Sequence, residues 1–420
     1  MDFELQAIDG HDIAERLAQV LNAEGCGRRH TPIILIAMTE PAYPAARAVA
    51  ARVQRHFTEH LAAARRRGRS DLAPEPDAMD IEAMIDAAFW ASLRREEGVT
   101  PTISLALLPP EGAGQAITFA HDLPLRAAPL AKLAPAVERP GIHLGVWRQY
   151  MNGGGGDLRV WGTTRAIPAF CPVVEVIASG LIVIKHRTDP FGKFMNVAVL
   201  EGDQIKIVDE GFSRTAECPQ PVKSLLGFDT PYRASGQVDV LVQLAASMRA
   251  HHRGGALLVV PAGTEAWRDS IVTPVLYSVE PPFTELAELV SQAGTETESH
   301  EWQEDLRRAV ATVAGLTAVD GATLITDRFE LMAFGAKLVR RRGSPPCERV
   351  VVTEPIEGSE TEIVPPASLG GTRHLSAAQF VFDQREAIAL VASQDGRFTI
   401  FKWAPTEDMV HAHRVEALLI

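Results

Sequence analysis

Two short segments in the second half of the chain carry residue types that could do chemistry. The first is Asp320-Gly321-Ala322, which places a carboxylate between an apolar helical pattern and an apolar strand pattern. A carboxylate at the entrance to a strand can hold a divalent metal ion or orient a hydroxyl, and a glycine beside it permits close approach of a ligand. An ordinary Asp-Gly turn is the alternative interpretation. Taken alone, this segment favours the turn.

The second segment runs from Gly370 to Ala378 and begins with two glycines followed by Thr372-Arg373-His374. Backbone N–H groups at the start of a helix bind phosphate, and Arg and His add positive charge beside them. A helix N-cap with incidental charge is the alternative. Because two successive glycines are costly unless the backbone must approach another group, we predict a polyphosphate-binding turn here.

The elements around these segments indicate an α/β domain. Apolar residues at helical spacing predict a long amphipathic helix over 302–316, which leads directly into a strand near Ala322. The same reasoning predicts a helix over 374–382 and strands at 255–260, 329–333, 349–353, 387–392 and 397–403. We therefore expect one α/β domain over residues 236–404, followed by a C-terminal tail over 405–420.

The first half of the chain has a different pattern. From residue 100 to 208, short apolar runs are broken by Pro and Gly, which predicts a β-rich block within an N-terminal α+β domain over 1–209. The four glycines between Asn152 and Asp157 predict a flexible hairpin connection, because the G-x-G-x-x-G order of a phosphate loop is absent. Residues 210–235, with three prolines and no periodicity, are typical of a linker.

Length, charge and cysteine content limit the function classes. The 420 residues allow two or three domains, and the net charge of −12 makes nucleic acid a poor candidate partner. Four cysteines without a C-x-x-C pair do not make a disulfide scaffold. The apolar runs are too short to span a bilayer, and the Met-Asp-Phe-Glu start lacks the basic residues of a signal peptide. We expect a cytoplasmic protein with no membrane anchor.

Other polar clusters carry weaker signals. The adjacent His251-His252 and the pair His411 and His413 are predicted to be solvated, because no carboxylate or thiol lies at zinc spacing. Metal binding is the alternative for both. The run of three arginines at 340–342 is interpreted as a solvated charge run, with a triphosphate contact as the alternative.

Four segments in this order resemble the diadenylate cyclase domain family. They are GALLVV at 255–260, Val-Asp-Gly-Ala at 319–322, Gly-Thr-Arg-His at 371–374 and Ala-Leu-Val-Ala-Ser at 389–393. The resemblance covers about residues 236–404, and the order of four motifs is more specific than any one of them. Residues 89–209 are similar, more weakly, to the sensor domain that precedes a subset of these cyclase domains.

The resemblance implies a mixed central sheet flanked by helices. It also implies condensation of two ATP molecules to cyclic di-AMP between two facing domains, and hence a homodimer or higher homo-oligomer. It assigns metal binding, of Mg²⁺ or Mn²⁺, to Asp320, and catalytic roles to Asp320, Gly321, Arg373 and His374. Nucleotide contacts are implied for Leu338, Gly371, Thr372, Arg373, His374, Ser376 and Ser393.

One position departs from the family pattern. Active members usually read Gly-Thr-Arg-His-Arg, whereas the fifth position here is Leu375. Loss of a charged hydrogen bond to phosphate costs roughly 1.5–3 kcal/mol, or about ten- to a hundredfold in affinity or rate. The sequence therefore leaves three functions open. They are a diadenylate cyclase under control of an N-terminal sensor, a nucleotide or cyclic-dinucleotide sensor that binds without turnover, and a structural assembly protein with the same fold.

Overall fold

The computed structural model describes residues 40–95, 98–150, 156–188, 194–215, 218–226, 240–275, 277–292 and 300–420. The chain divides into a first unit over residues 1–41 and a compact unit over 42–420. The first 39 residues of the predicted N-terminal domain lie outside the described residues, as do most of the glycine-rich connection at 152–157 and the end of the predicted linker.

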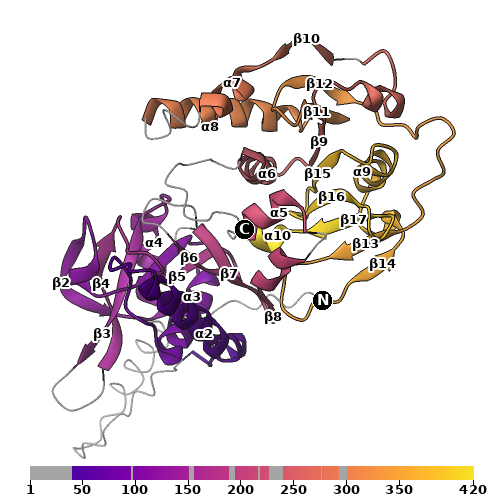
Figure 1. Cartoon of the computed structure of the whole chain (residues 1–420). Helices are drawn as coiled ribbons and strands as arrows, with labels where there is room; N and C mark the ends of the chain where they lie inside the picture. Colours follow the sequence, from indigo (N-terminus) through magenta and orange to yellow (C-terminus); the bar gives the residue numbers. More distant parts are fainter. Residues whose placement is uncertain are drawn as a thin grey trace, which may run out of the picture. The chain divides into compact units, whose positions relative to one another are not determined.

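An eight-stranded sheet forms the centre of the N-terminal part (Figure 1). Its strand order is β2-β4-β3-β1-β5-β6-β7-β8, with β1 parallel to β3 and the other neighbours antiparallel. The strands are β1 (Ile103–Leu107), β2 (Ile117–Pro124), β3 (His143–Tyr150), β4 (Gly156–Thr164), β5 (Val173–Ala178), β6 (Leu181–Arg187), β7 (Phe194–Glu201) and β8 (Gln204–Ile207). Every residue of β1 is buried, as expected for a strand covered on both faces.

Three helices cover one face of this sheet. They are α2 (Pro44–Arg66), α3 (Ala78–Ser92) and α4 (Ala127–Val137). Their apolar residues, such as Val53 and Ile85, share one core with Leu105 and Ile184 of the strands. A smaller cluster around Trp161 packs on alternate strand residues. The N-terminal part is therefore α+β and rich in strands, as predicted.

A nine-stranded mixed sheet forms the centre of the C-terminal part. Its order is β10-β12-β11-β9-β15-β16-β17-β13-β14, with parallel pairs β9–β11 and β13–β17 (Figure 1). The strands are β9 (Gly255–Val260), β10 (Tyr277–Phe283), β11 (Ala322–Thr326), β12 (Leu331–Ala336), β13 (Val350–Thr353), β14 (Glu362–Val364), β15 (Ile388–Ala392), β16 (Phe398–Ala404) and β17 (Met409–Arg414). All residues of β9 and β11 are buried, which explains their continuous apolar sequences.

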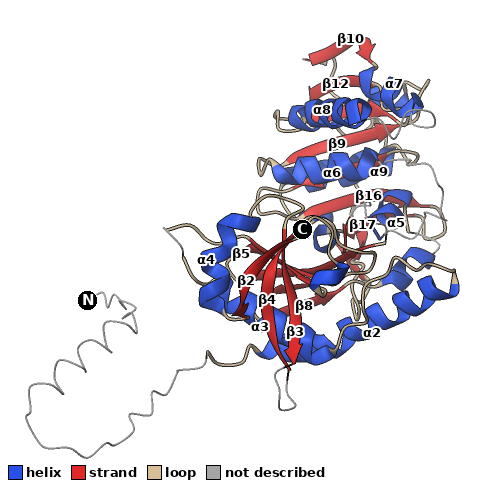
Figure 2. Ribbon diagram, turned by 90° about the vertical axis from the view of Figure 1, so that its left-hand side faces the viewer, coloured by secondary structure: helices blue, strands red, loops and turns tan. Residues whose placement is uncertain are grey.

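Helices cover both faces of the nine-stranded sheet. On one face α6 (Val240–Ala250) and α8 (His300–Leu316) pack side by side (Figure 2), with α5 (Gln220–Leu226), α7 (Glu285–Gln292) and α10 (Glu416–Leu419) around them. On the other face α9 (Thr372–Asp383) packs through Ala377, Phe380 and Val381. Four short 3₁₀ helices, η1 (Pro110–Gly112), η2 (Glu210–Arg214), η3 (Ala266–Ser270) and η4 (Pro366–Ser368), complete the described elements. The predicted mixed sheet flanked by helices is confirmed.

Two features differ from the sequence interpretation. Residues 405–420 are not a tail, because β17 lies inside the sheet between β16 and β13. His411 and His413 are accordingly buried rather than solvated: His413 Nδ1 lies 2.7 Å from Thr353 Oγ1, and His411 Nε2 lies 3.1 Å from Glu407 Oε2. The described part of the predicted linker is also folded, since Val222 and Leu225 of α5 belong to the core under α6 and α8.

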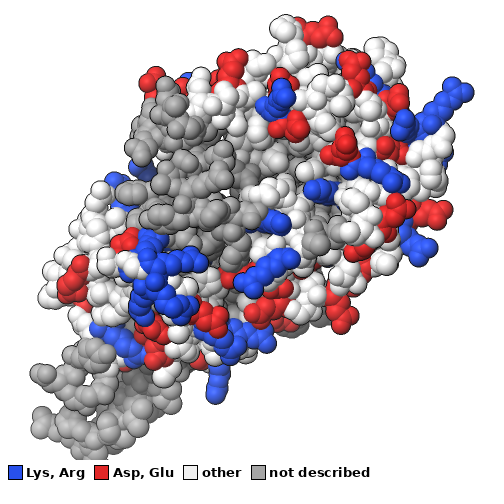
Figure 3. All heavy atoms as spheres, in the orientation of Figure 1, with Lys and Arg blue, Asp and Glu red and all other residues white. Residues whose placement is uncertain are grey.

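Charged side chains are distributed over both parts. On the face drawn in Figure 3, basic side chains gather most densely at one place, and acidic side chains border them. Among the described residues, no helix combines the length and the apolar character needed to cross a membrane.

Candidate functional site at one end of the C-terminal sheet

The strand register brings several predicted site residues to one end of the nine-stranded sheet. Ala322 of β11 pairs with Ala256 of β9 and with Ala336 of β12, and Ala256 also pairs with Val391 of β15. The segments just before β9 and β11 and just after β12 and β15 must therefore lie at the same end. These segments contain Gly254, Asp320, Leu338 and Ser393. We call this place the strand-end site.

Asp320 is the exposed acid of the strand-end site. Its carboxylate accepts a hydrogen bond from the Lys337 ammonium, which lies directly after β12. This bond, with the charge of Lys337 and the more distant charge of Arg373, holds the pKa of Asp320 below its ordinary value. The carboxylate is therefore ionised at neutral pH and faces two cations.

The fold requires a glycine at position 321. Its φ of +114° is one that side-chain-bearing residues rarely adopt, and a Cβ there would lie 2.4 Å from the carbonyl carbon of Gly335 on β12. The close approach is thus made by the neighbouring strand, not by a ligand as the sequence suggested. The effect is to hold the backbone next to Asp320 tightly against β12.

The predicted phosphate turn forms the start of α9. Gly371 is the N-cap and supplies no side chain to cap the helix, so the first N–H groups of α9 receive no side-chain cap. Thr372 is exposed, Arg373 and Ser376 are half-buried, and Leu375 is 44% exposed. The start of α9 thus offers backbone donors and a guanidinium, with an apolar side chain beside them.

Arg373 lies against the entrance to β9. A Cβ on Gly254, whose φ is +70°, would be 2.9 Å from Arg373 Nη1 and 3.3 Å from the carbonyl oxygen of Ala392. Because Ala392 ends β15, the guanidinium is positioned over the ends of two adjacent strands. It is also close enough to Asp320 for its charge to lower the pKa of that acid.

His374 occupies a different environment from Arg373. Its side chain is buried, packs edge-on to Phe401 with ring centroids 6.1 Å apart, and its Nε2 has no hydrogen-bond partner among the described residues. Burial lowers its pKa, so the ring is neutral. A Cβ on Gly370 would lie 2.6 Å from His374 Nδ1, so the first glycine of the pair makes room for this ring.

Ser393 and Leu338 complete the predicted set. Ser393 follows β15, is half-buried, and its hydrogen bond to Asp395 holds the pKa of that acid below its ordinary value. Leu338 lies opposite Ile271 in an isolated bridge. That bridge uses the carbonyl of Lys337 and the N–H of Val339, at 2.8 and 3.0 Å from their partners. The backbone groups of Leu338 itself lie outside it.

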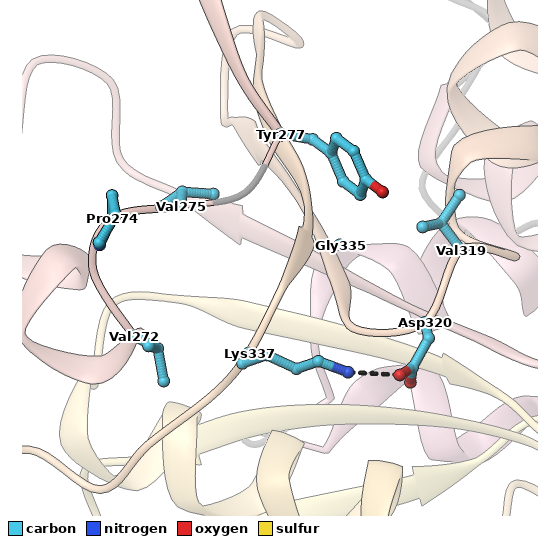
Figure 4. A pocket seen from close by; sticks show the side chains of 8 residues that line it. All are labelled: Val272, Pro274, Val275, Tyr277, Val319, Asp320, Gly335 and Lys337. Atoms are coloured by element: carbon cyan, nitrogen blue, oxygen red, sulfur yellow. Dashed lines mark hydrogen bonds and ion pairs between the residues drawn. The ribbon is translucent and has the colours of Figure 1, made fainter.

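A pocket of about 420 Å³ lies beside Asp320 (Figure 4). Its walls are mainly apolar, and the Asp320–Lys337 pair lies at one side of it. The lining residues are Val272, Pro274, Val275, Tyr277, Val319, Asp320, Gly335 and Lys337. A pocket of this size with a few polar groups suits a small organic ligand. It adjoins Leu338, whose neighbour Lys337 is part of the lining.

Sequence analysis missed several residues of this site. Gly254 precedes the recognised GALLVV segment, and its neighbour Gly255 is equally constrained, because a Cβ there would lie 2.6 Å from the carbonyl oxygen of Thr317. The Gly-Gly pair was a visible signal. Tyr277 and Lys337 carried no signal of their own, since Tyr277 depends on the pairing of β10 with β12 and Lys337 on the pairing of β12 with β11.

Comparison with known proteins supports a sensor region in the N-terminal part. Residues 70–165 match the family described as "Probable sensor domain DACNV". This match spans α3 to β4, and covers part of the region in which the sequence suggested such a domain. Residues 70–165, which lie ahead of the nine-stranded sheet, are therefore similar to a probable sensor domain.

Two further comparisons are less informative. No curated protein matches this chain. Among solved structures, the crystal structure of the hypothetical membrane spanning protein from Bacillus cereus is 18% identical, covering 46% of this chain and 69% of that chain, with a TM-score of 0.24. A similarity this distant carries no conclusion about function.

Proposed function

We propose that the C-terminal domain is a diadenylate cyclase, which condenses two ATP molecules to cyclic di-AMP under control of the N-terminal sensor-type region. The observation that carries this proposal is the convergence of Asp320, Arg373 and the start of α9 at one end of a sheet, beside a pocket of about 420 Å³. An acid, a guanidinium and free helix N–H groups around a mainly apolar pocket match the parts of a nucleoside triphosphate.

Each part of ATP has a suitable place in this arrangement. The flat base fits the apolar walls near Tyr277, with the backbone of Leu338 available for its edge. The triphosphate fits the start of α9, where Arg373 and backbone N–H groups provide donors. Thr372 and Ser393 offer hydroxyls there, whereas the buried ring of His374 supports the turn from beneath.

The reaction needs positioning more than covalent chemistry. The 3′-oxygen of one ATP forms a bond to the α-phosphorus of the other, the bond from that phosphorus to the β-phosphate oxygen breaks, and pyrophosphate leaves. The hydroxyl proton passes to solvent. A second transfer in the opposite sense closes the ring. Because each domain holds one ATP, two copies of this chain must face each other, and Arg373 neutralises charge on the leaving group.

Asp320 has the donor chemistry for the metal ion that such a reaction uses. Mg²⁺ is usually held by one or two carboxylates together with substrate phosphates, and Asp320 provides one exposed carboxylate. When bound, Mg²⁺ or Mn²⁺ would supply Lewis-acid stabilisation of phosphate charge. Lys337 now bonds one oxygen of this carboxylate, and it would have to share or release that oxygen if a metal ion were bound there.

Leu375 supports a second candidate function, nucleotide binding without turnover. It exposes an apolar side chain in the first turn of α9, at the position where active members of the resembled family usually carry an arginine. Such a domain would act as a nucleotide or cyclic-dinucleotide sensor.

One experiment separates the two candidates. Purified protein is incubated with ATP and Mg²⁺ or Mn²⁺, and the products are separated by chromatography and identified by mass. We expect cyclic di-AMP and pyrophosphate. ATP that binds but is recovered unchanged with either metal would favour the sensor, and absence of both binding and turnover would reject both candidates.

A further inference from the structure

A cluster of histidines outside the strand-end site has the form of a metal centre. His56 and His60 are four residues apart on α2, so their side chains lie on the same face of the helix. Glu210, the first residue of η2, approaches both rings. One ligand atom from each of the three lies within 4.8 Å of the others. We call these three residues, with the adjacent His186, the histidine cluster.

The distances from Glu210 to the two rings match those between ligands of a tetrahedral metal site. Glu210 Oε1 lies 3.2 Å from His60 Nε2 and 3.4 Å from His56 Nδ1. Ligand atoms held at about 2.0–2.2 Å from a tetrahedral Zn²⁺ are roughly 3.3–3.5 Å apart. The Glu210 carboxylate is therefore spaced from each ring as two ligands of one ion are, and one nitrogen of each ring lies within 4.8 Å of the other.

The tautomer of His60 is fixed by a backbone carbonyl of α2. His60 Nδ1 lies 2.9 Å from the backbone carbonyl oxygen of His56, so this nitrogen carries the proton and donates it. The lone pair of Nε2 then faces the Glu210 carboxylate at 3.2 Å. Two acceptors at this distance require a positive charge between them, which is either a second proton on the ring or a metal ion.

His186 contacts the ring of His56. Its Nε2 lies 3.0 Å from His56 Nε2, and its side chain, on β6, is 1% exposed. In the tautomer in which His56 Nε2–H donates to His186 Nε2, His56 Nδ1 is an acceptor toward Glu210. Metal-bound histidines commonly have the other ring nitrogen bonded in this way, which fixes the orientation of the ring.

We propose that His56, His60 and Glu210 bind one divalent transition-metal ion, with His186 as the positioning residue for His56. Imidazole nitrogens and one carboxylate suit Zn²⁺ among the common ions. The three side chains are 16%, 22% and 30% exposed, so the site is shielded but leaves one side open to solvent or another small ligand. A site with three protein ligands and an open position fits this burial.

The position of the cluster would allow this ion to act as a signal. Glu210 directly follows Val208 and Asp209, which pair with the segment after β13: the N–H of Asp209 donates to the carbonyl of Pro355 at 3.0 Å, and Val208 bridges Ile356. An ion would therefore tie α2 to a segment that is bonded to the nine-stranded sheet. Metal occupancy is thus a candidate input of the sensor-type region, a role that goes beyond the proposed cyclase reaction.

Metal binding can be measured without ATP, so the test is independent of the function of the strand-end site. Full-length, tag-free protein is stripped with a chelator and titrated with Zn²⁺ against a competing fluorescent chelator. We expect one Zn²⁺ per chain, with affinity reduced at least about 100-fold in His60→Ala and in Glu210→Gln. His121→Ala, which removes an exposed histidine of β2, is the matched control and should bind as the wild type does.

Two readouts distinguish lost ligation from lost folding. Co²⁺ in place of Zn²⁺ should give the visible bands of a four-coordinate site in the wild type and in His121→Ala, and not in Glu210→Gln. Zn²⁺ should raise the Tm of the wild type and leave that of Glu210→Gln unchanged. The proposal is overturned if the stripped wild type binds neither ion at micromolar concentration, or if Glu210→Gln and His60→Ala bind Zn²⁺ as tightly as the control.

Discussion

The strand-end site and the histidine cluster are assembled in opposite ways. In the first, main-chain pairing of four adjacent strands brings charged residues to one end of a sheet, where Asp320 and Arg373 stay accessible. In the second, side chains from α2, β6 and η2 converge in a shielded place. The first is proposed to take a large ligand that brings its own charges, and the second to take a compact cation. The comparison suggests that each site can be disabled without the other.

Removing the acid of the strand-end site should have the largest effect. Asp320→Asn keeps the size of the side chain but loses the charge that would hold a metal ion, and we expect cyclic di-AMP formation to fall about 10²–10³-fold. The measurement is initial rate with ATP and Mn²⁺. Asp327→Asn, just beyond the other end of β11, is the matched control. Zn²⁺ binding should be unchanged in both; an equal loss of rate in the two variants would contradict the assignment.

Adding a guanidinium beside Arg373 should have the next largest effect. Leu375 is 44% exposed in the first turn of α9, so Leu375→Arg can project toward bound phosphate without disturbing the core. One charged hydrogen bond contributes roughly 1.5–3 kcal/mol, which predicts ATP binding about ten- to a hundredfold tighter. Calorimetric titration with a non-hydrolysable ATP analogue measures it. Leu375→Gln is the uncharged control, and a gain as large as that of arginine would refute the electrostatic explanation.

A side chain added at Gly254 should displace Arg373 and cause a smaller effect, which is a loss of ATP affinity. In Gly254→Ala the new Cβ would lie 2.9 Å from Arg373 Nη1, so the guanidinium must shift, and we expect ATP affinity to fall about tenfold. Gly263→Ala is a close control, because Gly263 has φ +77° and nothing within 4 Å of a Cβ. Both variants carry similar backbone strain. Equal ATP affinity in the two would show that Arg373 does not contact the nucleotide.

Protonation of the buried histidines in the two sheets should have the smallest effect, and this effect is on stability. His143 bonds Ser104 and His413 bonds Thr353, each at 2.7 Å, and burial lowers the pKa of His143 to about 4 and of His413 to about 3 from the usual 6.5. For His413 the nearby His411 and Lys402 add to the effect of burial. Between pH 6.5 and these values the unfolded chain binds more protons than the native one, so stability falls as the pH falls.

The test of this pH dependence is a change of slope. His413→Gln removes a group that takes up as much as one proton when the chain unfolds. Below pH 6.5 the free energy of unfolding of this variant should therefore fall less steeply with falling pH, by up to about 1.4 kcal/mol per pH unit. Urea unfolding at pH 7, 6 and 5 measures it, with His252→Gln, an exposed histidine, as the control. An unchanged slope in His413→Gln would mean that this ring is protonated in the native state.

The parts of the fold with simple apolar patterns were predictable. Strands β9, β11 and β15 are continuous apolar runs because both faces of the sheet are covered. Strand β17 was missed because its sequence, MVHAHR, contains two histidines that resemble a solvated tail. Its pairing with β16 and β13 buries both rings, and Thr353 and Glu407 supply partners that the sequence alone does not indicate.

For the two sites as well, the sequence indicated some features and not others. Asp320 and Arg373 stood out because their neighbours Gly321 and Gly371 are unusual, but their common position depends on a strand order that sequence does not reveal. His374 was assigned to the nucleotide, and only the packing of α9 on Phe401 shows that its ring is buried. For the histidine cluster the single visible signal was the His56-x-x-x-His60 spacing, because Glu210 lies about 150 residues further along the chain.

The position of β17 also bears on how the polypeptide acquires its structure during synthesis. The hairpin of β13 and β14 attaches to the rest of the sheet through β17, about 60 residues later in the chain. Until that strand emerges from the ribosome, β13 has an unpaired edge open to other chains. Chains that end before this strand should therefore expose the edge of β13 and aggregate more readily than the full chain.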